Sequence, residues 1–124
     1  MILKLSDIKR YCQRQSYRTT DILYECRKFL EGPESRKTVV VITHNQSMVG
    51  FFTEQLRDSF DLSVTRMGYI QNASTGNIVI ITTLKSVKMA IIGRTIHDVY
   101  FDCPEYDVFK REEFGELLAH MRNE

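Results

Sequence analysis

The 124-residue sequence contains no tryptophan, only two prolines and only three cysteines. Cys12, Cys26 and Cys103 are odd in number, lie far apart and form no C-x-x-C pair. This pattern argues against a disulfide framework and against a zinc site. We therefore predict that all three thiols are reduced and that Cys26 lies in the core.

Long apolar runs are absent as well. No stretch approaches the ~20 apolar residues that a membrane-spanning helix needs. The segment Met1 to Leu5 is too short, and too soon interrupted by Lys4, to resemble a signal peptide. We therefore expect an intracellular protein that does not enter a membrane.

The composition that is present, 43% hydrophobic and 27% charged, is ordinary for a globular protein. A chain of this length can bury roughly two thirds of the surface that it exposes when unfolded. No repeat, linker or low-complexity segment divides the sequence. We therefore predict a single domain over residues 1–124.

The net charge of +1 conceals a polarity along the chain. Residues 1–37 carry nine Lys or Arg against five Asp or Glu, whereas residues 98–124 carry three against eight. This polarity has two interpretations: an electropositive face that binds phosphates or nucleic acid, or an attraction between the two terminal segments.

Helices and strands are predicted to alternate in the first half. A short basic helix is expected over residues 6–13, and a second from about residue 19 to a stop at Gly32-Pro33. Residues 38–42 are mostly β-branched, which is typical of a strand buried on both faces, and we expect this strand to be central. Asn45 is predicted to cap the next helix, whose apolar stripe comprises Met48, Phe52, Leu56 and Phe60.

The second half predicts shorter elements. A strand is expected over residues 62–65, and a β-hairpin pairs the segment around Tyr69 with residues 78–81. An amphipathic segment over residues 84–92, a buried strand over residues 98–102 and a helix over residues 109–121 follow. The predicted fold class is α/β, with a mainly parallel twisted sheet flanked by helices and carrying a β-hairpin.

A phosphate-binding pattern precedes the second helix, but its key residues are replaced. A phosphate loop needs glycines so that backbone N–H groups can surround the phosphates, and a lysine that reaches the outer phosphates. Here Cys12 and Tyr17 occupy the glycine positions and Arg18 occupies the lysine position. Thr19 follows directly, and the strand over residues 98–102 ends in Asp102.

The successive motifs Arg-Thr-Thr-Asp-Ile-Leu, Val-Val-Val-Ile-Thr-His, Gly-Asn-Ile-Val-Ile-Ile-Thr-Thr, Ile-Ile-Gly-Arg and Asp-Val-Tyr-Phe-Asp span most of residues 16–105. Their order resembles the ATPase core of phage terminase large subunits and the related helicase-type, RecA-like P-loop NTPases. The resemblance implies a P-loop-NTPase-like fold. It also implies a nucleotide site in which Arg18 and Thr19 match the phosphate-loop Lys and Ser/Thr, and Asp102 matches the residue that holds Mg²⁺ through water.

The same resemblance implies that hydrolysis is lost. Cys103 stands where active members carry the Glu that polarises the attacking water. Phosphoryl transfer depends on positioning and charge stabilisation, so losing two glycines, the lysine and the glutamate together removes most of it. Two alternatives stay open, in which Asp102 is a strand-end cap and Arg18 is a solvated charge at a helix start.

A basic row suggests nucleic-acid binding. Arg10, Arg14 and Arg18 recur every four residues and would share one face if the first helix continued. His44 follows the strand over residues 38–42, where α/β folds bind ligands and related helicase-type proteins contact nucleic-acid backbone. The alternatives are that His44 is structural and that the row pairs with the acidic stretch around Glu113.

These features predict a small phage or viral protein that resembles P-loop proteins, lacks efficient ATP hydrolysis and acts as a binding or regulatory module. No catalytic residue, metal ligand or cofactor is expected. The main expectation is a protein partner, with nucleic acid or self-association as alternatives, and a location in the host cytoplasm or in a virion. Two other functions stay open: a variant ATPase or DNA-packaging NTPase fragment completed by a partner, and a structural virion component.

Overall fold

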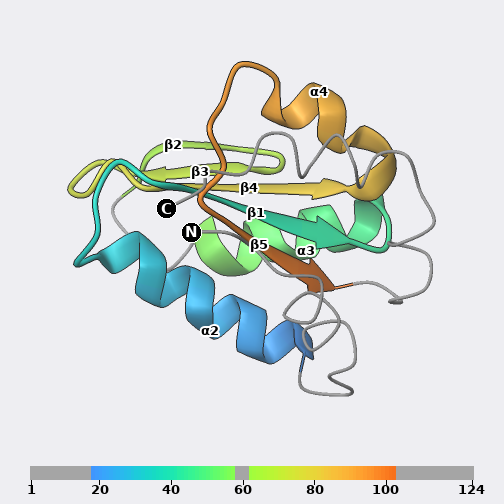
Figure 1. Ribbon diagram of the computed structural model, residues 1–124. Helices are drawn as coiled ribbons and strands as arrows, with labels where there is room; N and C mark the ends of the chain where they lie inside the picture. Colours follow the sequence, from blue (N-terminus) through green and yellow to red (C-terminus); the bar gives the residue numbers. More distant parts are fainter. Residues whose placement is uncertain (1–17, 58–61, 103–124) are drawn as a thin grey trace.

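The computed structural model describes residues 18–57 and 62–102, which form a mixed five-stranded sheet with helices on both faces (Figure 1). Along the chain the elements are α2 (Arg18–Glu31), β1 (Thr38–Thr43), α3 (Gln46–Arg57), β2 (Leu62–Arg66), β3 (Tyr69–Asn72), β4 (Ile78–Thr83), η1 (Leu84–Ser86), α4 (Val87–Ile91) and β5 (Asp98–Asp102). The predicted helices over residues 6–13 and 109–121, and Phe60, lie outside the described residues. The α/β fold class is confirmed.

Strand order in the sheet is β2-β3-β4-β1-β5. β1 is parallel to both of its neighbours, β4 and β5, whereas β3 is antiparallel to β4 and β2 is antiparallel to β3. Every residue of β1 is buried, as expected for a strand covered on both faces. β1 is thus an inner strand, as predicted, although β4 occupies the middle of the five.

The alternating side chains of β1 enter two separate cores. Val39 and Val41 pack with α2 and α3, whereas Val40 and Ile42 pack with η1 and α4 on the opposite face. Cys26 of α2 is completely buried in the first core, as the sequence predicted. Burial raises the pKa of its thiol, so Cys26 is a structural residue and not a nucleophile.

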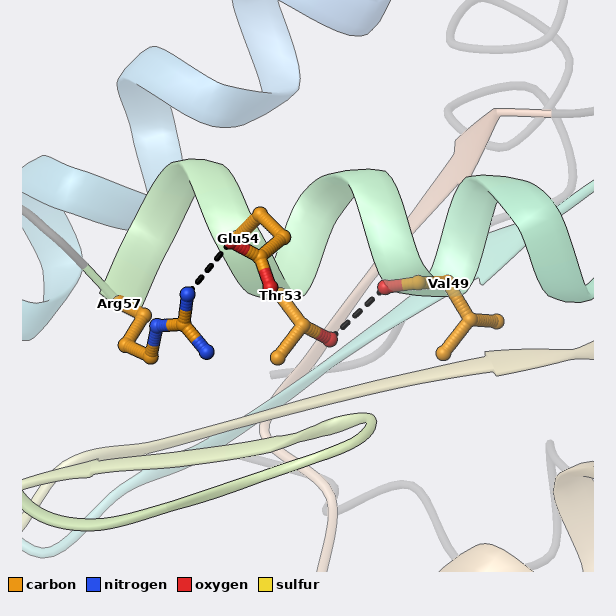
Figure 2. Close-up of polar contacts among 4 residues, drawn as sticks. All are labelled: Val49, Thr53, Glu54 and Arg57. Atoms are coloured by element: carbon orange, nitrogen blue, oxygen red, sulfur yellow. Dashed lines mark hydrogen bonds and ion pairs between the residues drawn. The ribbon is translucent and has the colours of Figure 1, made fainter.

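Asn45 precedes α3 and caps it as predicted, because its Oδ1 accepts a hydrogen bond of 3.0 Å from the Met48 N–H. Phe52 and Leu56 of α3 are fully buried against the sheet. The described part of α3 ends at Arg57, whose guanidinium pairs with Glu54 one turn earlier (Figure 2).

The carboxyl end of α2 is held by asparagine side chains from the β3–β4 connection. Asn77 is fully buried, and its Nδ2 donates to the carbonyls of Phe29 and Glu34, each at 2.8 Å. Asn72 Nδ2 donates to the Leu30 carbonyl at 2.7 Å. The last turn of a helix leaves carbonyls without helical partners, and these amides satisfy them without water.

Two hairpins follow α3. The predicted hairpin between β3 and β4 is confirmed, with Tyr69 opposite Ile80 and Ile70 opposite Val79. The sequence did not predict the second hairpin, in which β2 pairs with β3 across the turn at Met67 and Gly68.

This turn is anchored to both α3 and β4 through Gly68. The Gly68 N–H donates to Thr53 Oγ1 at 3.0 Å, and its carbonyl accepts from the Ile81 N–H at 2.8 Å. Thr53 Oγ1 also donates to the Val49 carbonyl at 2.7 Å, as Figure 2 shows. Gly68 has a φ of +75°, and an added Cβ would lie 2.5 Å from the Ile81 carbonyl oxygen, so only glycine fits without a shift.

We predict that Gly68→Ala lowers the free energy of unfolding by roughly 2–4 kcal/mol, because the left-handed conformation costs about 1–2 kcal/mol and the Ile81 carbonyl must also move. Urea denaturation followed by circular dichroism measures the loss. Gly93→Ala is the matched control, since Gly93 has a φ of +76° but nothing within 4 Å of an added Cβ. Equal losses in the two variants would show that the close approach to Ile81 contributes nothing.

Candidate functional site

The carboxyl ends of three parallel strands carry a row of polar residues. Thr43 at the end of β1 is in register with Thr83 of β4 on one side and with Asp102 of β5 on the other. Thr43 follows Val41 by two residues, and Asp102 follows Tyr100 by two residues. Since Val41 and Tyr100 face α2 and α3, and side chains two residues apart in a strand point to the same side, Thr43 and Asp102 also lie on the side of α2 and α3. In α/β sheets this edge is where ligands bind.

Asp102 meets the first turn of α2 at this edge. Thr19 Oγ1 lies 3.0 Å from each carboxylate oxygen of Asp102 and donates its proton to them. The two residues are 83 positions apart in the sequence, and Asp102 is buried.

The donor set partly suits the Mg²⁺ that the resemblance implies, because hydroxyl and carboxylate oxygens are the ligands that this ion takes. However, the Thr19 hydroxyl and the Asp102 carboxylate are bonded directly to each other. Across residues 18–57 and 62–102, no three His, Cys, Asp or Glu side chains gather as metal ligands would. The pair is therefore a hydrogen-bonded contact between α2 and β5, and a Mg²⁺ ion there would need water or phosphate oxygens as its other ligands.

The other residues predicted for binding are distributed differently. Arg18 is the first residue of α2 and precedes Thr19 in the same turn. His44 is exposed directly after β1, at the same edge of the sheet as Asp102. Arg10 and Arg14 lie outside the described residues. The structure thus brings together Thr19 and Asp102, two of the three residues predicted to bind nucleotide.

A cavity of about 450 Å³ lies at the opposite edge of the sheet, beside the amino ends of β1 and β5. Its lining includes Glu25 and Lys28 of α2, together with His97 and Asp98. His97 Nδ1 accepts a hydrogen bond of 3.1 Å from the Thr38 N–H, which fixes the ring against β1. No sequence pattern indicated this cavity, because its lining residues come together only when α2 packs on the paired strands β1 and β5.

Folding changes the ionisation of Asp98, which lines this cavity. Burial raises the pKa of the Asp98 carboxyl, and the negative charges of Glu25 and Glu34 add to the rise. A hydrogen bond of 2.8 Å from the Val99 N–H to Asp98 Oδ1 opposes it. Since the pKa is raised in the folded state, ionised Asp98 destabilises the fold.

We therefore predict that Asp98→Asn stabilises the protein at neutral pH. The gain should shrink as the pH falls toward the ordinary value of 3.8, because the carboxyl is then protonated in both the folded and the unfolded state. Thermal melts of both proteins from about pH 4 to pH 7 measure the difference. Glu31→Gln, at an exposed position of α2, is the control. A gain that is constant over this range would contradict the prediction.

Within the described part of the chain, no helix has the length and apolar character required to cross a membrane. Comparisons with protein-family models, with curated proteins and with solved structures found no match.

Proposed function

We propose that this protein is a P-loop-like α/β domain, of phage or viral origin, that lacks efficient ATP hydrolysis and acts as a binding or regulatory module on a protein partner or on nucleic-acid machinery. The observation that carries the proposal is the hydrogen bond from Thr19 to both carboxylate oxygens of Asp102. It joins the two residues that the resemblance assigns to the phosphate loop and to the Mg²⁺ site. Their contact supports the relationship in fold.

The residues that replace the phosphate loop oppose nucleotide chemistry. Cys12 and Tyr17 stand in place of the glycines whose N–H groups would surround the phosphates. Cys103 also cannot replace a glutamate as the group that polarises water. Binding to a macromolecule is therefore the better-supported role.

The second candidate is a variant NTPase that a partner completes. The observation that favours it is again the Thr19–Asp102 pair, because its hydroxyl and carboxylate already lie next to each other. Arg18 would supply the positive charge of the missing lysine, and the partner would supply the remaining groups. Nucleotide titration separates the two candidates.

We expect titration calorimetry to show no Mg²⁺-dependent ATP binding tighter than about 1 mM. The physical reason is the absence of a glycine-rich cradle and of the lysine. Parallel titrations with EDTA in place of Mg²⁺ show whether any heat depends on the metal. Micromolar binding that requires Mg²⁺ would overturn the proposal and favour the variant NTPase.

A double-mutant cycle tests the Thr19–Asp102 contact itself. Thr19→Val and Asp102→Ala should each destabilise the protein, and their effects should be non-additive by about 1–3 kcal/mol, because either change removes the same charge-assisted hydrogen bond. Urea denaturation of the four proteins gives the coupling energy. Thr20→Val is the matched control, since Thr20 is an exposed threonine in the same turn of α2. Additive effects would show that the contact contributes no stability.

A further inference from the structure

The β2–β3 turn and α4 expose large apolar side chains beside one groove. Met67 in the turn is 69% exposed and Met89 of α4 is 75% exposed. Both line a groove of about 340 Å³ whose lining also includes Arg66, Gly68, Tyr69 and Ala90. We call this surface the methionine groove. Its lining comes from α3, the β2–β3 hairpin, β4, η1 and α4, and includes no residue of α2, which Figure 1 shows along a different part of the sheet.

The segment that contains the methionine groove carries charge of one sign only. Residues 62–97 include four Lys or Arg and no Asp or Glu. Arg66 lies in the lining itself, next to Met67. A ligand in the groove therefore meets apolar thioethers next to a cation.

Two guanidinium groups are held at the groove by an aromatic ring. The Arg66 guanidinium carbon lies 4.4 Å from the centre of the Tyr69 ring, and that of Arg94 lies 5.1 Å from it. Contacts at these distances are favourable cation–π interactions. They fix positive charge at the rim, so the cations need little further ordering when an anionic ligand binds.

We propose that the methionine groove binds an acidic amphipathic helix of a partner protein. This inference rests on the proposed function as a binding module and names the surface and the partner's chemistry. An apolar side chain of the helix inserts between Met67 and Met89, whose unbranched and polarizable side chains adapt to its shape. A carboxylate beside that side chain faces Arg66, which gives orientation and electrostatic attraction.

A single nucleic-acid strand fits the methionine groove less well. Strand binding uses aromatic faces on which the bases stack, but the Tyr69 ring is partly buried and already contacts two guanidiniums. A phosphodiester backbone would also leave the two exposed methionines without an apolar partner. An acidic helix covers the apolar and the cationic part of the surface together.

The test uses the full chain and two synthetic helical peptides of about 15 residues, a length at which helices begin to be stable. Both peptides carry the same leucine stripe, flanked by glutamates in one and by lysines in the other. Fluorescence polarisation at low salt should show at least about tenfold tighter binding of the glutamate peptide. An oligothymidylate strand is the third probe and should bind more weakly than the glutamate peptide.

Variants locate the binding surface. Met67→Ser, Met89→Ser and Arg66→Glu should each weaken binding of the glutamate peptide by about tenfold. Tyr24→Ser and Lys28→Glu are the matched controls, because both positions are exposed on α2 and lie away from the groove. Thermal melts of every variant check that folding is retained, and the controls should bind as the parent does.

Several results would overturn the proposal: equal binding of the two peptides, tighter binding of the oligothymidylate strand, or equal losses in the groove and control variants. Self-association that is abolished by Met67→Ser would also overturn it, because a second copy would then be the occupant. The nucleotide titration is independent of these results. Mg²⁺-dependent ATP binding with an unchanged peptide result would reject the proposed function and leave the groove as a peptide site.

Discussion

The parallel pairing of β1 with both β4 and β5 is the constraint on which the other features of this structure depend. Its register aligns Thr43 with Asp102 at one edge of the sheet and places Asp98 beside the amino end of β1 at the other. Because side chains alternate along a strand, a slip of one residue would send Asp102 to the face of α4 and remove it from α2. The complete burial of β1 prevents such a slip, since every residue of the strand is already committed to a core.

Contacts at the carboxyl end of α2 help to set the position of this helix on the sheet. Asn77 and Asn72 bind the last carbonyls of α2 at the amino edge of the sheet. A helix rises ~1.5 Å per residue and a strand ~3.3 Å, so the stretch of α2 from this anchor back to Thr19 covers about the length of a six-residue strand. Thr19 consequently reaches Asp102 at the carboxyl edge. A buried asparagine pair at one end of the helix thus helps to set the candidate site at the other.

Much of this fold could be predicted from the sequence, because its strongest signals are local. The β-branched run at β1, the cap at Asn45 and the turn between β3 and β4 are each encoded within a few residues. The β2–β3 hairpin was missed because its turn contains only one glycine, Gly68. Glycine is required there because the Ile81 carbonyl lies close to it, and that contact exists only in the folded protein. Non-local contacts of this kind leave no periodic signal.

The candidate site was predictable only through the resemblance to P-loop proteins. Thr19 and Asp102 carry no spacing that would pair them, and only the order of motifs suggested that they meet. The charge of Asp98 and the cavity around it depend on burial by elements distant in the sequence, so no local pattern indicated them. The anchoring of α2 by Asn72 and Asn77 was not predicted, since a sequence does not show whether an amide is buried.

Buried polar side chains of the described residues are hydrogen-bonded inside the protein, whereas two large apolar side chains, Met67 and Met89, are exposed to water. In the described residues every buried side-chain nitrogen and oxygen has a hydrogen-bond partner, so the interior presents no unmet polar demand to a ligand. At the carboxyl edge, the Asp102 carboxylate is likewise engaged by Thr19. Met67 and Met89 instead remain in water beside fixed cations, and exposed apolar groups gain free energy when a partner covers them. Covering the two methionines would therefore contribute favourable free energy to the binding that we propose at the methionine groove.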